Sequence, residues 1–407
     1  MPESEGGRLV FRQLYETLAR VDCEGQPRQA LEHSWSRDSM GSVWTFVVAP
    51  GHTFADGSPI DAAAVVAGWE HRATPGRTSA LPRVISVQAT GVREVRLRFA
   101  APEENAPRIV SDWKFAIMGP AQPNGVPSAS GPFVIASAEP ASDGTIAALT
   151  LTPRDAGTHA PVLKFAAVSA GTDLRDALDR GIATIGLARI DVVLSRDPEV
   201  LAYVARRGDY RSIALPWDRT YVLVAAASAL DAATPVSIPS AAERDALARD
   251  AVRSDARGAE PPFWWLQDST CAASPRPPSG RVRREVGYVA GDVISRELAE
   301  RVVALAALPA RPAWIPNSLV ADARSPLRVV PLPADSLDDA IASGRVAAAV
   351  LSRRRQAPAG CSAGAERVRA RDEVPLIDSR AHVIFRGSGA AFSIEGDGTI
   401  RFTPAKP

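Results

Sequence analysis

The chain has few of the residues that build metal, redox and catalytic centres. It holds three cysteines and five histidines in 407 residues. No Cys-x-x-Cys pair occurs and no two histidines stand three or four residues apart, so the usual spacings of a zinc site are missing. G-x-S-x-G, H-E-x-x-H, G-x-x-x-x-G-K-[ST] and the dinucleotide-binding fingerprint are also missing. These absences argue against a metalloenzyme, a serine hydrolase and a nucleotide-dependent enzyme.

The sequence also lacks a charge of one dominant sign and a long apolar run. The net charge is +1, and 46% of the residues are hydrophobic, as in ordinary globular proteins. A nucleic-acid partner or a polybasic membrane tether would leave a strongly basic footprint. The longest apolar run, near Tyr221–Leu230, is too short to cross a bilayer. We therefore expect a globular protein long enough for two or three cores.

The three cysteines leave two alternatives open. Cys271 and Cys361 both lie in loops rich in Pro, Ser, Gly and Ala, where a disulfide could join the two loops. Cys23 makes the count odd, and unpaired thiols are the other reading of the same pattern.

The most informative stretch runs from Val43 to His71. Alternation over Val43–Val48 predicts a strand, and Pro50–Gly51 and Asp56-Gly57-Ser58-Pro59 predict two tight turns. Asp61 can cap a following helix whose apolar positions share one face, namely Val65, Val66 and Trp69. A strand, two turns and an amphipathic helix would then pack as one module, which by itself favours a structural role.

A helix, a glycine stop and an apolar run occur twice along the chain. Leu174–Gly181 precedes Ile182–Ala188, and Leu337–Gly344 precedes Val346–Leu351. Glycine permits the left-handed conformation that ends many helices, and continuous apolar runs are typical of buried strands. The repetition favours two similar α/β lobes.

Several motifs together resemble one protein family. The order Trp-Thr-Phe, apolar residue, Gly, Phe, Asp-Gly-Ser-Pro and helix is similar to the signature segment of the family 5 extracellular solute-binding proteins. These are the peptide-, nickel- and oligosaccharide-capturing subunits of bacterial ABC importers. Four further segments follow in family order, namely Leu9–Leu18, Ala30–Trp35, Ser130–Val134 and Leu376–Ile384. The resemblance covers nearly the whole chain.

The resemblance implies an α/β type II periplasmic-binding-protein fold with two lobes, a hinge and a discontinuous first lobe. We expect lobe I at 1–216 and 372–407, with a reduced accessory subdomain within about 36–125, and lobe II at 217–371. The chain would cross between lobes near Pro216–Tyr221 and Arg371–Leu376. Hinge closure would bury a ligand between the lobes.

The implied function is non-catalytic delivery of a small solute, most often a short peptide, to an ABC transporter permease. We expect a monomer with no cofactor, no metal and no nucleic-acid partner. A ligand-sensing or interaction module on the same fold is the alternative. Met1 is followed by Pro-Glu-Ser-Glu rather than by a secretory signal. Since the family is exported, we expect a periplasmic or extracytoplasmic protein whose leader was trimmed, with lipid anchoring left open.

Aromatic and charged residues near the expected crossing are the candidate ligand-binding residues. Trp217, Asp218, Arg219 and Tyr221 lie at the first crossing, although Trp217 packing in a hinge core and a surface ion pair remain the alternatives. The resemblance places Tyr15 and Glu16 near the cleft, against a core position for Tyr15. Trp264 and Trp265 form an aromatic cluster in a chain poor in aromatics, and a loop plug is equally compatible.

Arg353 marks a departure from the peptide-binding pattern. Many peptide-binding relatives follow the strand that matches Val346–Leu351 with Gly-Trp and then an Asp, which pairs with the peptide's ammonium group. Here the Trp position falls on Arg353 and the Asp position on or near Gln356. A buried ammonium group without a carboxylate is costly, so the arginines of Ser352–Gln356 could favour an anionic group instead. A solvated turn is the alternative.

Overall fold

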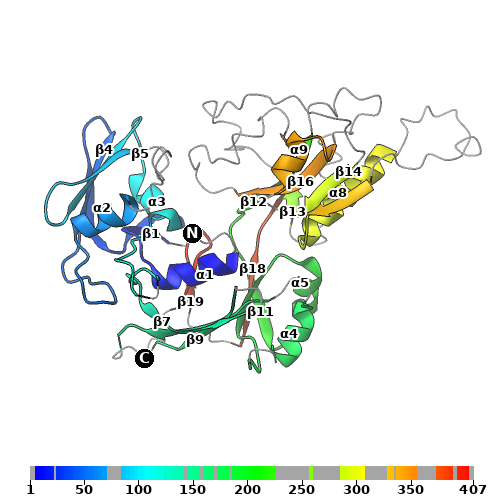
Figure 1. The fold of residues 1–407 in the computed structure, drawn as a ribbon, viewed down its shortest axis with the longest axis horizontal. Coiled ribbons are helices and arrows are strands. Elements are labelled where there is room, and N and C mark those ends of the chain that lie inside the picture. Colours follow the sequence, from blue (N-terminus) through cyan, green and yellow to red (C-terminus); the bar gives the residue numbers. More distant parts are fainter. Residues whose placement is uncertain are drawn as a thin grey trace, which may run out of the picture. The chain divides into compact units, whose positions relative to one another are not determined.

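A computed structural model gives the fold of the chain, and Figure 1 shows its elements. The structure describes residues 5–22, 24–70, 84–123, 125–141, 145–155, 160–168, 172–182, 186–225, 256–259, 285–307, 328–333, 336–354, 373–387 and 392–402. All three cysteines lie outside these ranges, so the predicted disulfide does too. Contacts between Cα atoms divide the chain into two units. Unit 1 contains 1–194, 209–211 and 384–407, and unit 2 contains 195–208 and 212–383. The predicted lobe boundaries at 216/217 and 371/372 stay a prediction.

An antiparallel sheet with a helix packed on it forms the first part of unit 1 (Figure 1). Its strand order is β3-β4-β6-β5, and its elements are β3 (Glu32–Arg37), β4 (Val43–Val48), α2 (Ala62–Glu70), β5 (Val84–Ala89) and β6 (Glu94–Phe99). Strand β4 and helix α2 confirm the predicted strand–turn–turn–helix module. The Asp61 carboxylate accepts from the Ala64 backbone N–H at 2.8 Å, which is the predicted cap. Gly57 has φ +85°, as its tight turn requires.

The rest of unit 1 consists of smaller sheets and helices. Its elements are α1 (Glu5–Leu14), β1 (Ala19–Val21), β2 (Pro27–Gln29), α3 (Ala106–Val110), a 3₁₀ turn (Trp113–Phe115), β7 (Phe133–Pro140), β8 (Ile146–Pro153), β9 (Leu163–Ala166), α4 (Leu174–Arg180), β19 (Phe392–Ile394) and β20 (Ile400–Phe402). Strands pair as β1-β2, β7-β8-β9 and β19-β20. Gly181 ends α4 with φ +72°, confirming the predicted glycine stop. Within the predicted strand 182–188, the described residues form only an isolated bridge between Ile182 and Leu187.

The largest sheet lies in unit 2 and contains six strands in the order β13-β17-β12-β16-β14-β15. Its elements are β12 (Arg219–Ala225), β13 (Ala256–Gly258), β14 (Glu285–Val289), α8 (Val293–Ala307), β15 (Arg328–Leu332), α9 (Leu337–Ala342), β16 (Ala348–Arg354) and β17 (Glu373–Ser379). Strand β14 is parallel to β15 and β16, whereas β12 is antiparallel to β16 and β17. The predicted unit of helix, glycine and strand is confirmed here by α9, Gly344 and β16.

A three-stranded sheet holds the unit boundaries at 194/195, 211/212 and 383/384. Its order is β10-β18-β11, with β10 (Val192–Ser195), α5 (Pro198–Ala205), β11 (Tyr210–Ala214) and β18 (His382–Arg386) as the elements of this region. Asp197 caps α5 through the Glu199 backbone N–H, as the Asp-Pro start predicts.

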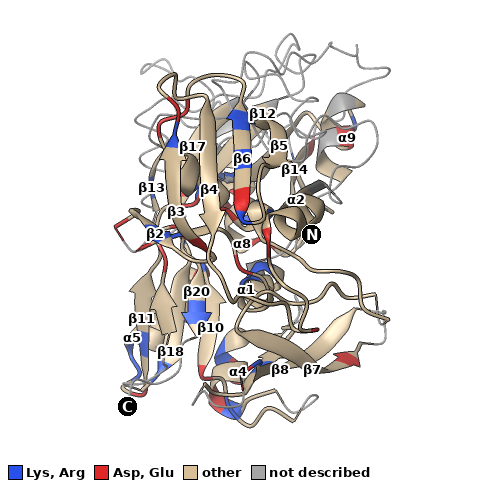
Figure 2. Ribbon diagram, turned by 90° about the vertical axis from the view of Figure 1, so that its left-hand side faces the viewer, with Lys and Arg blue, Asp and Glu red and all other residues tan. Residues whose placement is uncertain are grey.

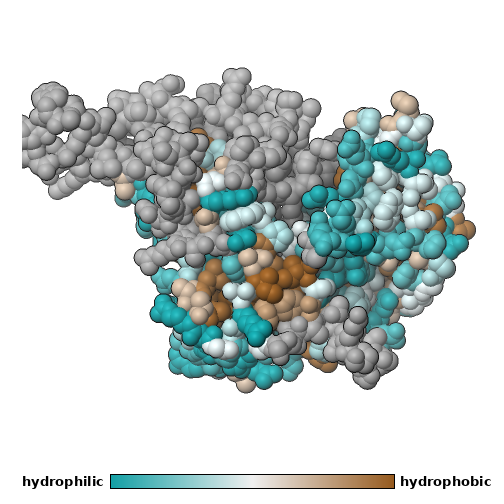
Figure 3. Space-filling model, turned by 180° about the vertical axis from the view of Figure 1, so that it is seen from behind, coloured by the Kyte–Doolittle hydropathy of each residue, from teal (hydrophilic) through white to brown (hydrophobic). Residues whose placement is uncertain are grey.

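Apolar side chains fill separate cores. One core lies under the six-stranded sheet of unit 2, and two lie in unit 1 around the four-stranded sheet and around α1 with β7 and β8. Charged residues of both signs are interspersed along the described ribbon in Figure 2. On the face viewed in Figure 3, hydrophilic residues cover most of the described surface, and brown residues gather mainly in its lower central part. Among the described residues, no helix combines the length and apolar character needed to span a bilayer.

Candidate functional site

Tyr15 and Glu16 directly follow helix α1, which ends at Leu14. Tyr15 is 4% exposed, packs against Phe11 at 4.8 Å between ring centroids, and donates its hydroxyl to the Pro127 carbonyl at 2.9 Å. These contacts are those expected of a core residue, which is the alternative interpretation of Tyr15. A role for Tyr15 in binding ligand stays a prediction.

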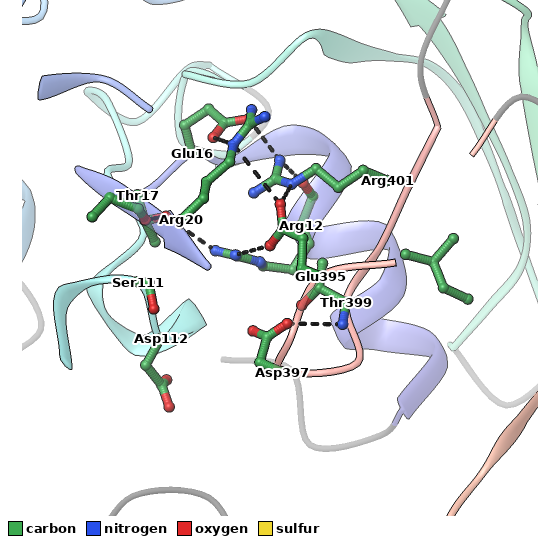
Figure 4. Close-up of polar contacts among 12 residues, drawn as sticks. Arg12, Glu16, Thr17, Arg20, Ser111, Asp112, Glu395, Asp397, Thr399 and Arg401 are labelled. Carbon is green, nitrogen blue, oxygen red and sulfur yellow. Dashed lines mark hydrogen bonds and ion pairs between the residues drawn. The ribbon is translucent and has the colours of Figure 1, made fainter. Parts of the chain in front are cut away.

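Glu16 lies in a buried group of charges, which we call the Glu16 cluster (Figure 4). Its five principal members are Arg12, Glu16, Arg20, Glu395 and Arg401. Arg401 donates to Glu16 and to Glu395, in each case at 2.6 Å, and Arg12 donates to Glu395 at 3.0 Å. The Arg12 and Arg401 side chains are 2% and 4% exposed. The cluster therefore joins the end of α1 to the β19–β20 hairpin, although almost 400 residues separate them in sequence.

The electrostatics of the cluster favour ionised Glu16. Burial alone would raise its pKa, but Arg401 and Arg20, followed by Arg12, overcome this effect and lower the pKa to about 2. Asp112 interacts electrostatically with Arg12, Asp397 interacts with Arg401, and Lys114 interacts in turn with Asp112. Counting them, four cations face four carboxylates. Internal partners thus satisfy the Glu16 carboxylate, and its predicted contact with ligand remains a prediction.

Three of the segments that carry the family resemblance meet next to Glu16, namely Leu9–Leu18, the Asp56–Pro59 turn and Ser130–Val134. Ser130 accepts the Glu16 backbone N–H at 2.9 Å, and the Gly131 N–H donates to the Leu14 carbonyl at 2.8 Å. A Cβ at Gly131 would lie 2.6 Å from the Gln13 carbonyl oxygen, so only glycine fits against this segment. The Asp56–Pro59 turn joins them, because the Ala55 N–H donates to the Ala129 carbonyl. The motifs therefore form one packed junction within unit 1.

In unit 2, most of the remaining candidates lie at one edge of the six-stranded sheet. The strand directions place the carboxyl ends of β14–β17 and the amino ends of β12 and β13 along this edge. Ligands of open α/β sheets bind outside the carboxyl ends of strands. We call this edge, with the residues Arg196, Trp217, Asp218, Arg219, Arg257, Asp292, Arg353, Asp378 and Arg380, the arginine edge.

Trp217 and Asp218 approach this edge just before β12. The half-buried Trp217 ring lies under two guanidinium groups, those of Arg257 at 4.7 Å and Arg380 at 4.4 Å from the ring centroid. Cation–π attraction at such distances orients both arginines. Asp218 accepts two hydrogen bonds from Arg196 Nη2, at 2.9 and 2.6 Å.

Tyr221 lies in β12 on the face covered by α8. It is 1% exposed and donates its hydroxyl to the Asp292 carboxylate at 3.0 Å. Burial and, secondarily, the negative charge of Asp292 raise the Tyr221 pKa far above its ordinary value. Asp292 also accepts the Ser295 N–H at 3.0 Å and so caps α8. Tyr221 therefore connects β12 to the start of a helix as a neutral donor.

The structure brings some of the predicted residues together and separates others. Arg219 pairs in register with Ser379 across to β17, and Arg353 of β16 is directly opposite Thr220. Trp217, Asp218, Arg219 and Arg353 thus share the arginine edge, and the buried Tyr221 contacts it through Asp292. Tyr15 and Glu16 belong to unit 1. Trp264, Trp265 and Gln356 lie outside the described residues. None of these placements tests ligand binding directly.

Sequence reasoning missed five edge residues, Arg196, Arg257, Asp292, Asp378 and Arg380. Asp378 and Arg380 lie within the predicted segment Leu376–Ile384, and β17 ends at Ser379, so only the observed end of the strand brings the rule on carboxyl strand ends to bear on them. Arg257 carried no such signal, because β13 has three residues in a long irregular stretch of sequence. The described residues contain no group of three His, Cys, Asp or Glu side chains placed to hold a metal ion.

Comparison with known proteins shows which protein family the sequence resembles. Residues 26–148 match the sequence model of the bacterial extracellular solute-binding proteins, family 5 middle region. A search of curated proteins gave no significant match.

Three solved structures illustrate the likeness in fold. NikA from Staphylococcus aureus in complex with Ni(L-His)2 has a TM-score of 0.69 at 11% identity, covering 98% of this chain and 95% of that one. AppA from Bacillus subtilis in complex with a nonapeptide has a TM-score of 0.66 at 10% identity, covering 99% and 95%. AgaA from A. tumefaciens R10 in complex with agropinic acid has a TM-score of 0.66 at 11% identity, covering 98% and 95%.

The predicted type II periplasmic-binding-protein fold is therefore confirmed over nearly the full chain. The predicted resemblance to the family 5 extracellular solute-binding proteins is confirmed by the family match at residues 26–148.

Proposed function

We propose that this protein is a non-catalytic solute-binding protein, which captures a small solute outside the cytoplasm and delivers it to an ABC importer. The single observation that carries the proposal is the coincidence of the family match at residues 26–148 with the shared fold over nearly all of the chain. The similar proteins bind Ni(L-His)2, a nonapeptide and agropinic acid. A short peptide remains the predicted solute of this chain.

The arginine edge supports capture rather than turnover. Its side chains are guanidinium groups, carboxylates and one indole ring, and these recognise charge and shape. Among the described residues of the edge, no histidine, cysteine or serine is paired as a nucleophile with a base. Such a set can hold a solute without changing it.

A thermal-unfolding screen tests the proposal. The protein is heated with short peptides, nickel–histidine complexes, organic acids and sugars, each at 1 mM. A solute that binds only the folded state stabilises it by about 2.7 kcal/mol at one hundred times its Kd, so we expect a Tm rise of several degrees with at least one class. Titration calorimetry then gives the Kd, and product analysis after overnight incubation checks that the solute is unchanged. Absence of a shift with every class would contradict solute capture.

A further inference from the structure

Strand β5 is an open edge of the four-stranded sheet, whose order is β3-β4-β6-β5. Proteins usually protect edge strands from pairing with other chains by charged residues or proline. The sequence of β5 is VISVQA, which contains neither. Among the edge strands of five or more residues in the described sheets, β5 is alone in this respect. The others contain Arg37 in β3, Glu139 and Pro140 in β7, Arg211 in β11 and Arg328 in β15.

The outward backbone groups of β5 lie at Val87 and Ala89. The Thr90 N–H donates to the Glu94 carbonyl of β6 at 2.9 Å, so the backbone groups of Thr90 point toward β6. Because these groups alternate in direction along an antiparallel strand, positions 86 and 88 also point toward β6, whereas positions 87 and 89 point away from it. Among the described residues, Val87 and Ala89 have no hydrogen-bond partner on this outer side. Their donors and acceptors can therefore pair with one more strand.

The regular part of this edge is exposed and uncharged. A register irregularity near the start of β5 leaves Ile85 outside the ladder, and the pairing with β6 is regular from Ser86 onward. Gln88, Ala89 and Thr90 are exposed, and Ile85 beside them is 58% exposed. We call residues 86–90 the β5 edge. Its side chains are hydroxyls, an amide and small apolar groups, so a strand that pairs with it meets no charge.

We propose that the β5 edge pairs with the β5 edge of a second copy of this chain, antiparallel and centred on Gln88. This register places Val87 opposite Ala89 of the second copy, so the outward groups of both residues form hydrogen bonds across the joint. It also places Ser86 opposite Thr90 of the second copy, and such hydroxyl pairs form hydrogen bonds between strands. The same surface serves both copies, as a two-fold dimer requires. The inference is independent of the proposed function and replaces the monomer expected from the sequence.

The charges of the neighbouring strand do not oppose this pairing. Arg96 and Arg98 lie on β6, opposite Gln88 and Ser86. The Arg96 residues of the two copies would be three strand spacings apart, about 14 Å, which exceeds the Debye length of about 8 Å at physiological ionic strength. The outer edges of the combined sheet would be the two β3 strands, which carry Arg37. Because a charged edge disfavours further pairing, the assembly stops at two copies.

Sedimentation velocity of the full chain tests the pairing. A short edge-to-edge contact gives a weak, reversible dimer, so the protein is measured between about 5 and about 500 µM. Gln88→Glu places two like charges directly opposite each other at the centre of the joint, whereas within one copy the new carboxylate faces Arg96. Ala89→Pro removes an outward N–H and keeps the hydrogen bonds between β5 and β6. The control Val92→Glu adds the same charge to an 81% exposed residue in the turn between these strands.

We expect the wild type to shift from monomer to dimer as its concentration rises, with no larger species. Gln88→Glu and Ala89→Pro should each raise the Kd of the dimer at least about tenfold, while Val92→Glu leaves it within about twofold. Circular dichroism and Tm check that each variant is folded. A wild type that stays monomeric throughout, growth beyond the dimer, or an unchanged Kd in folded Gln88→Glu would overturn the inference. Each of these results would leave solute capture intact, because the thermal-unfolding screen tests it separately.

Discussion

The Glu16 cluster and the arginine edge both gather arginines and carboxylates, but they differ in exposure. In the cluster, Arg12 and Arg401 are almost fully buried and bond to Glu16 and Glu395. At the edge, the Arg257 side chain is 35% exposed. Buried ion pairs therefore hold the cluster together, although Arg12 Nε and Arg401 Nη2 have no hydrogen-bond partner among the described residues. The ion pair of Arg257 at the edge is more accessible to solvent.

The difference in burial predicts different effects of substitution, although both regions contain arginines and carboxylates. Buried charges that lose one partner leave the other uncompensated in a medium of low dielectric constant. Exposed arginines lose little stability when changed, because water replaces the missing contact. Substitutions in the cluster should therefore lower stability more than substitutions of exposed arginines do.

Arg401→Met should have the largest effect. It removes the cation that contacts both Glu16 and Glu395 and leaves two buried carboxylates with fewer partners. We expect the free energy of unfolding to fall by about 3–5 kcal/mol, as measured by urea unfolding at pH 7. The matched control Arg180→Met breaks an exposed pair with Asp176 and should leave the free energy of unfolding almost unchanged. Equal losses in the two variants would remove the distinction between the regions.

The Glu16 cluster should also make stability depend on acid pH. The folded-state pKa of Glu16 is about 2, below its ordinary value of 4.5, so its stabilisation is complete above pH 4.5 and is lost as pH falls toward 2. This loss amounts to about 3 kcal/mol. Urea unfolding at pH steps between 5 and 2 measures it, and Glu16→Gln should flatten that part of the curve. An equally steep curve in the variant would assign the acid sensitivity to other carboxylates.

Asp378→Asn tests how much a partly exposed ion pair at the arginine edge contributes to stability. The asparagine keeps an oxygen for the Thr220 hydroxyl but removes the carboxylate that Arg257 binds. We expect a loss of about 1–2 kcal/mol in stability, because a charge-assisted bond to the partly exposed Arg257 is weakened. Urea unfolding at pH 7 measures this loss. A loss of about 3–5 kcal/mol, as expected for Arg401→Met, would mean that the edge depends on its ion pair as strongly as the cluster does.

Much of the local fold could be predicted from the sequence, because it depends on short-range signals. The alternation of Val43–Val48, the Asp61 cap and the glycine stop after α4 all depend on neighbours within a few residues. The sequence also shows the motif Ser130-Gly131, but it does not show why a glycine is required at position 131. Only the structure shows that Gly131 is needed where the backbone of Gln13 approaches it.

The site was less predictable, because its residues meet through long-range pairing. Arg257, Asp378, Thr220 and Arg353 come from four strands spread over more than 130 residues, and register alone aligns them. The same limit applies to Glu16, which was chosen as a cleft residue by family resemblance. Its bond to Arg401 depends on the return of the chain at the C-terminus, and no local pattern near Glu16 indicates that return.

The smallest effect is expected at Glu32, a buried carboxylate that lacks a cationic bond. Its Oε2 accepts the Ala30 N–H at 3.1 Å, and its buried Oε1 has no hydrogen-bond partner among the described residues. Burial raises the pKa of Glu32 to about 7, above its ordinary value of 4.5, so its contribution to stability decreases as pH rises from 4.5 to 7. Glu32→Gln should therefore stabilise the protein by about 1 kcal/mol at pH 8 and have little effect at pH 4, as measured by urea unfolding. Destabilisation at pH 8 would show that the charged carboxylate has a favourable partner, and Glu32 would then resemble Glu16.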